Sequence, residues 1–476
     1  MTKILWILNK YIGNEKEHEF FTNFLSETQI ELQKKGYELN FIFFSDLLSS
    51  DKSLTNKFVY DELNFSHLSA EELEIEANRI ERVYEFTLKQ AYFSDIIQTF
   101  KPRNYRKITI PKNEFKDLDF LIPRFLFLEH IIKSKNIDVI FSDVSPEAEM
   151  EFGRVIGNKL NKIVLKTTEG SALGKTVIQR ALKFGKYQLV EPQMNLFTED
   201  EAKKFCNEFI ENRQLPYKWP ERNSYIKSIK NRVANRIKKK EYLYFLKWLL
   251  DGIRNKLLQF SYLLERKLLK PLLYDSFDPS VPYLFIGFHL NQESTMALRA
   301  QPYTNQTVLV EMISRLLPHN HTLYVRAHPH WPDTYSYSYL SKMKKFPGVK
   351  IISDKISVHD IIKDSKGILT YTATTGIEAL IYNKPVLSFA SNIYIQHPAV
   401  NYCEDLYKLG EKLTKVINTK VRKKDTISFI AKMNTVSIDF LLGADCFSSI
   451  LDTEVKATTF SDFLHKSIMW CSENEN

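Results

Sequence analysis

The stretch GILTYTATTGIEALIYNKPVLSF, residues 367–389, runs from an apolar segment through a polar loop and a helical pattern into a second apolar segment. The two apolar segments, 367–372 and 385–389, are short and bounded by Gly, Lys and Pro, as buried strands commonly are. The hydroxyl-rich loop between them ends where the helical pattern begins. Strand, helix and strand in this order predict one unit of a parallel α/β sheet.

The same rhythm continues towards the amino terminus of this half. Further strand-like runs occupy 283–288, 322–327 and 349–353, with helical patterns between them. Five buried strands separated by helices predict a doubly wound domain, and such sheets bind ligands at the carboxyl ends of their strands. The polar residues that follow each strand are therefore the candidate site residues.

The amino-terminal half shows a similar alternation, interrupted by a less regular insertion at about 51–116. The expected strands are 4–8, 39–44, 137–141 and 163–166, and the expected helices are 17–35 and 146–160. This pattern predicts a second α/β domain with a parallel sheet. Beyond about residue 401 the chain is expected to be helical, with amphipathic patterns at 404–417, 428–442 and 459–470.

Four parts follow from these patterns: an amino-terminal α/β domain (1–220), a basic helical insertion (221–275), a carboxyl-terminal α/β domain (276–400) and a helical tail (401–476). A chain of 476 residues with 44% hydrophobic content is long enough for two large cores. Its apolar runs are too short to span a bilayer, and the amino terminus does not look like a signal peptide. We therefore expect a cytoplasmic protein. The four cysteines lack disulfide or metal-ligand spacing, so no structural metal is expected.

The excess of basic residues is concentrated in one segment. The chain has a formal net charge of +9, and much of the basic excess falls between Lys227 and Lys270, within and just beyond a helical pattern at 225–269. In that segment apolar residues recur three and four positions apart from Leu243 to Leu264, which predicts a helical seam. One interpretation is a connector packed on the body with a solvated basic face. The other is contact with an anionic membrane surface. No nucleic-acid-binding module is recognisable, so we expect no nucleic-acid partner.

The segment VRAHPH, 325–330, follows the second strand of the carboxyl half. Arg326 offers several donors to phosphoryl oxygens, His328 can donate a hydrogen bond to a leaving phosphate, and Pro329 restricts the turn that presents them. The alternative is an exposed loop with no ligand.

Hydroxyls and a glycine mark the start of the helix after the fourth strand of this half. Thr374 and Thr375 can cap the helix or bond a phosphate, Gly376 permits close approach, and Glu378 can accept hydrogen bonds from ribose hydroxyls. The alternative is an ordinary threonine cap with an acidic first turn. A third candidate pair, His289 and Glu293 after the first strand, suits donor or acceptor hydroxyls, or else belongs to a solvated loop.

The motifs FHLNQEST, LYVRAHPH and LTYTATTGIEALIYNKPVLSF resemble, in this order and spacing, the capsule polysaccharide biosynthesis glycosyltransferases over about residues 283–390. That group includes capsule β-Kdo transferases and is similar to bacterial sialyl- and polysialyltransferases. The resemblance implies the GT-B architecture, in which two Rossmann-like domains face a cleft. It also implies that His328 and Pro329 form a His-Pro motif, that Thr374 and Thr375 form a Ser/Thr motif, and that Glu378 contacts the nucleotide ribose.

The resemblance further implies that the acceptor and the catalytic base belong to the amino-terminal domain (1–220), and that the nucleotide sugar binds to the carboxyl-terminal one (276–400). Glu169, in TTEG at 167–170, resembles an acidic-acidic-glycine motif of the sialyltransferase-like enzymes, although Thr168 replaces the first acidic residue. Asp143 and Glu147 are alternatives after the preceding strand, because either carboxylate can take the proton of an acceptor hydroxyl.

The predicted activity is transfer of a sugar from a nucleotide-sugar donor to a glycan or lipid-linked acceptor of bacterial surface polysaccharide, with inversion. We expect no cofactor and no metal, because Arg326, His328 and the helix start at Thr374 can stabilise the leaving phosphate. Two alternatives remain open: a polyol-phosphate transferase of the teichoic acid type, and a non-catalytic nucleotide-binding protein that organises a membrane complex.

Overall fold

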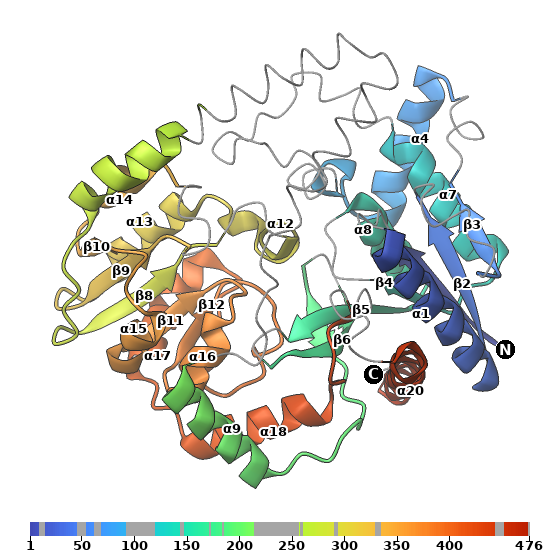
Figure 1. Ribbon diagram of the computed structural model, residues 1–476. Helices are drawn as coiled ribbons and strands as arrows, with labels where there is room; N and C mark the ends of the chain where they lie inside the picture. Colours follow the sequence, from blue (N-terminus) through green and yellow to red (C-terminus); the bar gives the residue numbers. More distant parts are fainter. Residues whose placement is uncertain are drawn as a thin grey trace.

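The computed structural model describes residues 1–8, 15–44, 54–60, 68–91, 120–142, 147–170, 173–182, 185–213, 257, 260–289, 294–328, 335–442 and 452–474. Within these ranges the chain forms two α/β domains, each built on its own sheet (Figure 1). Among the described helices, none has a long enough apolar stretch to cross a bilayer.

The amino-terminal sheet has seven described strands in the order β3-β2-β1-β4-β5-β6-β7. Their bounds are β1 Thr2–Leu8, β2 Tyr37–Phe43, β3 Lys57–Val59, β4 Val139–Ser142, β5 Ile163–Gly170, β6 Lys175–Ala181 and β7 Tyr187–Leu189. The first five are parallel, and β6 and β7 are antiparallel additions. All four strands expected in this half are present.

Helices cover both faces of this sheet. One face holds α1 (Glu15–Lys34), and the other holds α4 (Ala70–Tyr84), α7 (Leu121–Ser134) and α8 (Ala148–Lys159). Helix α8 approaches the sheet closely because it carries Gly153 and Gly157 on the buried side. A Cβ atom on Gly153 would lie 2.2 Å from Ile7 Cδ1, so a larger residue would push the helix away.

The carboxyl-terminal sheet has six described strands in the order β10-β9-β8-β11-β12-β13, all parallel. The bounds are β8 Tyr283–Gly287, β9 Thr322–Arg326, β10 Val349–Ile352, β11 Gly367–Thr370, β12 Val386–Ser388 and β13 Val400–Tyr402. The five predicted strands are confirmed, and β13 is an unpredicted sixth.

Alternate residues of these strands face two separate cores. On one face lie α12 (Ser294–Arg299), α13 (Gln306–Leu316), α14 (Tyr337–Met343) and α17 (Leu409–Asn418). On the other lie α9 (Glu199–Asn212), α15 (Val358–Asp364), α16 (Thr375–Ile381) and α18 (Lys423–Thr435). The predicted doubly wound α/β class is therefore confirmed for both halves.

The chain leaves the amino-terminal domain after β7 and returns to it after α18. The predicted helix 428–442 is wrong beyond Thr435: the helix ends there, and Ile438 forms a bridge with Thr176 of β6. The β-branched residues Thr435, Val436 and Ile438 favour such a bridge over further helix. The last helix, α20 (Thr453–Glu473), then packs along α1 (Figure 1).

Helix α20 completes the core of the amino-terminal domain. The Phe460 ring lies 5.3 Å from Trp6 and 5.5 Å from Phe141, between centroids. Tyr37 and His465 share a hydrogen bond of 2.8 Å between Oη and Nδ1. The amino-terminal domain is thus built from both ends of the chain.

Most of the predicted basic insertion lies outside the described residues. The described end of its apolar seam is exposed to solvent: Leu257, Phe260 and Leu264 have relative exposures of 65%, 58% and 42%. This part of the seam is therefore not buried against the body.

Candidate functional site

The candidate site lies at the topological switch point of the carboxyl-terminal sheet. Strand β8 leads outward to β9 and β10, and the chain then returns to β11 on the other side of β8. In sheets of this type the loops that follow the two strands diverge at the switch point, and ligands bind there at the carboxyl ends of the strands. In β8 and β9, Gly287 pairs with Arg326, so His289 and His328 lie two residues beyond the same level of the sheet.

His289 is buried and held by its backbone. Its N–H donates to Gln306 Oε1 at 3.1 Å, and its carbonyl accepts from Gln306 Nε2 at 2.8 Å. The imidazole packs edge-on against Tyr371, with ring centroids 5.6 Å apart. The switch point therefore brings the residue after β8 against the residue after β11.

Arg326 is a buried cation at the end of β9. One of its terminal nitrogens donates to the Ile356 carbonyl at 2.7 Å, while the buried Nε has no protein partner. Burial lowers the pKa of Arg326, and the negative charges of Glu378 and Asp354 oppose that effect. The guanidinium thus has one donor fixed by the protein and another left unsatisfied.

Glu378 of α16 is the acidic counterpart of Arg326. The carboxyl is 5% exposed, and burial raises its pKa, although a hydrogen bond from Thr374 and the charge of Arg326 act in the opposite direction. Its Oε2 atom has no protein partner. An unsatisfied acceptor here suits a donor group of a ligand, because leaving a buried carboxylate oxygen unbonded is costly.

Gly376 has a packing role that the sequence did not reveal. A Cβ atom at this position would lie 2.5 Å from Cζ of Tyr394, a buried ring whose hydroxyl donates to the Ala373 carbonyl at 3.0 Å. The glycine therefore allows the Tyr394 ring to pack under the start of α16. Thr374 lies at the N-cap position, but its hydroxyl does not cap the backbone. Thr375 is the first residue of α16.

Sequence reasoning missed Tyr371. Its side chain is fully buried between the rings of His289, Tyr303 and Phe389. Its hydroxyl has no protein partner, and burial raises its pKa well above the usual value. The residue lies inside the hydroxyl-rich motif, but an aromatic residue after a strand looks like ordinary core in sequence.

Several predicted residues cannot be placed in the site. Asp143, Glu293 and Pro329 lie outside the described residues. Glu169 belongs to β5, where its backbone pairs with Thr176 of β6. Glu147 is the residue that precedes α8. The identity of the base therefore stays a prediction.

A buried ion network lies on the amino-terminal side, next to β5. Glu151 of α8 accepts from Lys166 Nζ at 2.8 Å and from Arg154 Nε at 2.6 Å. Burial opposes ionisation of Glu151, but the two cations overcome this effect and lower its pKa to about 2. The Lys166 ammonium also lies 5.6 Å from the Tyr187 ring centroid.

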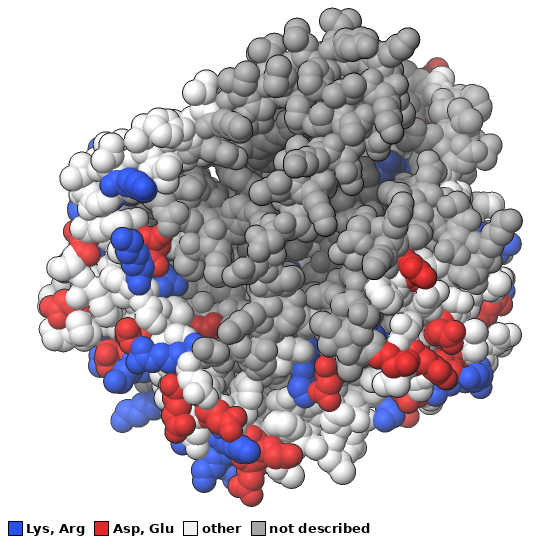
Figure 2. Space-filling model, viewed as in Figure 1, with Lys and Arg blue, Asp and Glu red and all other residues white. Residues whose placement is uncertain are grey.

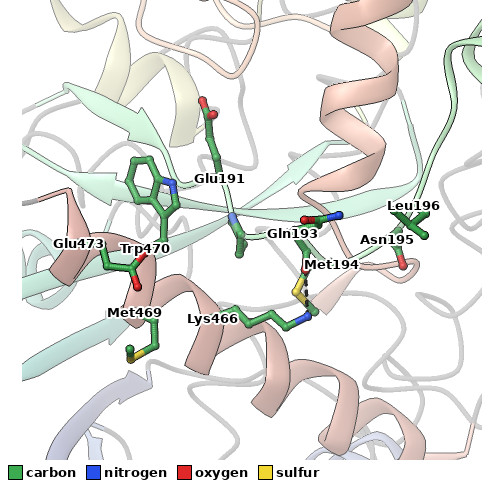
Figure 3. Close-up of a pocket in the computed structure, with 10 residues that line it drawn as sticks. Glu191, Gln193, Met194, Asn195, Leu196, Lys466, Met469, Trp470 and Glu473 are labelled. Carbon is green, nitrogen blue, oxygen red and sulfur yellow. Dashed lines mark hydrogen bonds between the residues drawn. The ribbon is translucent and has the colours of Figure 1, made fainter.

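Neither the described charges on the face in Figure 2 nor the groove in Figure 3 points to another centre. On the described surface of the face in Figure 2, acidic and basic side chains are interspersed along the lower edge, where α9 lies. An open groove of about 590 Å³ runs between residues 191–196 and α20 (Figure 3). None of the candidate site residues lines it. Within the described ranges, no cluster of three His, Cys, Asp or Glu residues could hold a metal.

Two doubly wound α/β domains, with buried polar residues at the switch point of the second, define a GT-B-type architecture. Residues 283–398 match the family model described as "Capsule polysaccharide biosynthesis protein". This match confirms the predicted resemblance for the residues that contain the candidate site. No curated protein matches the sequence significantly.

Solved structures with a similar arrangement include two Kdo transferases of Thermosulfurimonas dismutans. The β-Kdo 2,4-transferase is 11% identical, with a TM-score of 0.34 and coverage of 63% of this chain and 80% of that one. The β-Kdo 2,7-transferase is 14% identical, with a TM-score of 0.34 and coverage of 71% and 89%. The UDP-GlcNAc 2-epimerase of Methanocaldococcus jannaschii is 12% identical, with a TM-score of 0.25 and coverage of 91% and 99%. At such low sequence identity and TM-score, these similarities say nothing about the activity of this chain.

Proposed function

We propose that this protein is a glycosyltransferase of bacterial capsular or related surface polysaccharide, which takes a sugar from a nucleotide-sugar donor. The observation that carries the proposal is the pair Arg326 and Glu378. Both are buried at the switch point, both have an unsatisfied polar atom, and both lie within the family match. A buried cation beside an unsatisfied acceptor suits a phosphate next to a ribose hydroxyl.

In this proposal the donor lies against the carboxyl-terminal domain, and the acceptor hydroxyl attacks its anomeric carbon. Glu169 or Asp143 takes the hydroxyl proton. His328 and Arg326 stabilise the negative charge that develops on the departing nucleotide phosphate, with help from Thr374 and Thr375. The reaction inverts the anomeric configuration and needs no metal, because these groups supply the electrostatic stabilisation.

The test is calorimetric titration with CMP, CDP, UDP and GDP. We expect one nucleotide to bind selectively, and His328→Ala to weaken that binding about tenfold or more through loss of a charge-assisted hydrogen bond. His319→Ala, at an exposed position between α13 and β9, is the matched control and should bind as wild type. Folded protein that binds none of the nucleotides contradicts the proposal. Binding of CDP-linked polyols in preference to nucleotide sugars would favour the polyol-phosphate transferase.

We further propose that the protein works at an anionic membrane surface from within the cytoplasm. Residues 214–256 contain twelve Lys or Arg and three Asp or Glu. The residues that follow expose large apolar side chains, among them Leu257, Leu268 and Leu272, with relative exposures of 65%, 64% and 71%. Basic residues beside exposed leucines suit anionic head groups over an acyl layer.

The membrane proposal predicts that replacing Lys238, Lys239 and Lys240 together by Glu reduces binding to phosphatidylserine-containing vesicles about tenfold or more. Nucleotide affinity should not change. Vesicle binding equal to that of wild type would refute the membrane contact and leave the transferase proposal intact.

A further inference from the structure

A buried arginine connects the two domains close to the candidate site. Arg299 ends α12, the first helix after β8, and has a relative exposure of 7%. Its side chain leaves the carboxyl-terminal domain and reaches strands β5 and β6 of the other. One terminal nitrogen donates to Gln179 Oε1 at 2.9 Å and to Thr168 Oγ1 at 3.4 Å.

The same guanidinium is held from two further directions. Its other terminal nitrogen lies 3.5 Å from the Ser391 carbonyl, and its carbon lies 4.7 Å from the Tyr187 ring centroid. Ser391 in turn exchanges hydrogen bonds with the backbone of Tyr187, at 3.3 and 3.2 Å. We call the group formed by Arg299, Thr168, Gln179, Tyr187 and Ser391 the interdomain clasp.

Stability alone does not explain why a buried arginine joins the two domains. Arg299 is buried, and it donates hydrogen bonds to three neutral oxygens, those of Ser391, Thr168 and Gln179. Its Nε and the Nε2 of Gln179 are buried without partners. Burying a cation in this way is unfavourable, and such groups can instead fix a unique arrangement.

The geometry around the clasp leaves little freedom. At Gly185, where φ is +72°, an added Cβ would lie 2.9 Å from the Leu298 carbonyl oxygen, so the turn before β7 sits directly against the end of α12. Thr168, which accepts from Arg299, precedes Glu169 in β5. The clasp therefore links the helix after β8 to the strand that carries a candidate base.

We propose that Arg299 is a positioning residue, which holds the donor-binding domain in one orientation against β5; the inference rests on the proposed transferase function. It acts through the strand and touches neither donor nor acceptor. Misplacement of reacting groups by about 1 Å can cost on the order of 100-fold in rate. Loss of the clasp should therefore lower turnover without removing the donor site.

The experiment compares Arg299→Met, Arg299→Lys and Gln179→Met with wild type. For each protein, nucleotide affinity is measured by calorimetry and donor turnover by nucleotide release from the nucleotide sugar that wild type uses. Arg299→Met should keep nucleotide affinity within about twofold and lower kcat about 100-fold. Arg299→Lys should recover part of kcat, and Gln179→Met should lose less. Solution X-ray scattering should show a larger radius of gyration for Arg299→Met.

Lys186→Met is the matched control, because Lys186 forms an exposed ion pair across the same interface, with Glu404 at 2.5 Å. It should behave as wild type. Wild-type kcat in Arg299→Met, or equal losses of affinity and kcat, would overturn the inference. If the wild-type protein shows no turnover with any donor, the transferase proposal fails. The clasp is then tested by scattering alone, and an unchanged radius of gyration in Arg299→Met refutes it.

Discussion

Replacing Lys166 by Met should destabilise the protein, because it leaves the buried carboxylate of Glu151 with one cation instead of two. In the native protein the pKa of Glu151 is lowered from 4.5 to about 2. At about 1.4 kcal/mol per pKa unit, this corresponds to roughly 3 kcal/mol of stability, similar to the ~3–5 kcal/mol typical for breaking a buried ion pair. Both cations contribute to this shift, and Arg154 stays bound to Glu151 in the variant, so Lys166→Met should lose about 1–3 kcal/mol near neutral pH.

The effect of Lys166→Met on the free energy of unfolding should depend on pH. A carboxyl whose pKa is lower in the folded state stabilises the protein above the unfolded pKa of 4.5, and that stability is lost as the pH falls towards 2. On acidification the wild-type protein loses the stability that ionised Glu151 contributes. In the variant this contribution is smaller from the start. The difference in free energy of unfolding between the two should therefore shrink as the pH is lowered below 4.5.

Urea denaturation followed by circular dichroism, at a series of pH values, measures this difference. Lys159→Met is the matched control: its ion pair with Glu85 spans 3.1 Å, but the two side chains are 44% and 79% exposed. Such a pair contributes at most about 1 kcal/mol. A loss below about 1 kcal/mol for Lys166→Met, or a difference that does not change with pH, would refute the reasoning.

Two further predictions concern the carboxyl-terminal domain. Gly376→Ala should lower the free energy of unfolding by about 1–3 kcal/mol, measured by thermal denaturation, because its methyl group would lie 2.5 Å from the Tyr394 ring. Adding Tyr394→Leu should recover part of this loss. Wild-type stability of the Gly376→Ala protein would contradict the packing. Burial lowers the pKa of His397 from 6.5 to about 4, so the neutral ring contributes stability that is complete above pH 6.5 and is lost as the pH falls towards 4. His397→Gln should therefore flatten the pH dependence of stability between these values, and an unchanged slope would show that His397 is not its source.

The strands of both domains could be predicted because they are short apolar runs between polar turns. The five expected strands of the carboxyl half lie within about two residues of their observed ends. Strands β6 and β7 were missed, since their antiparallel pairing extends a parallel sheet without a helix between them. The helix 428–442 was overextended, because the bridge from Ile438 to Thr176 joins residues far apart in sequence.

Part of the candidate site could be predicted, because it depends on the same recognisable strands. Arg326 and Glu378 follow recognisable strands, so their position at one edge of the sheet follows from topology. The role of Gly376 depends on Tyr394, and that of Arg299 depends on Gln179, which lies on the other domain. Contacts of this kind connect distant parts of the chain and leave no local pattern.

The packing of α20 has a consequence for how the protein is made. Phe460 lies against Trp6 and Phe141, so these two rings are fully covered only after α20 has been synthesised, long after β1 and β4. Until α20 has been made, the nascent amino-terminal domain exposes an apolar face, which chaperones can bind and proteases can attack. A premature stop before residue 453 would leave that face uncovered permanently, and such a product should be degraded rather than accumulate as a stable fragment.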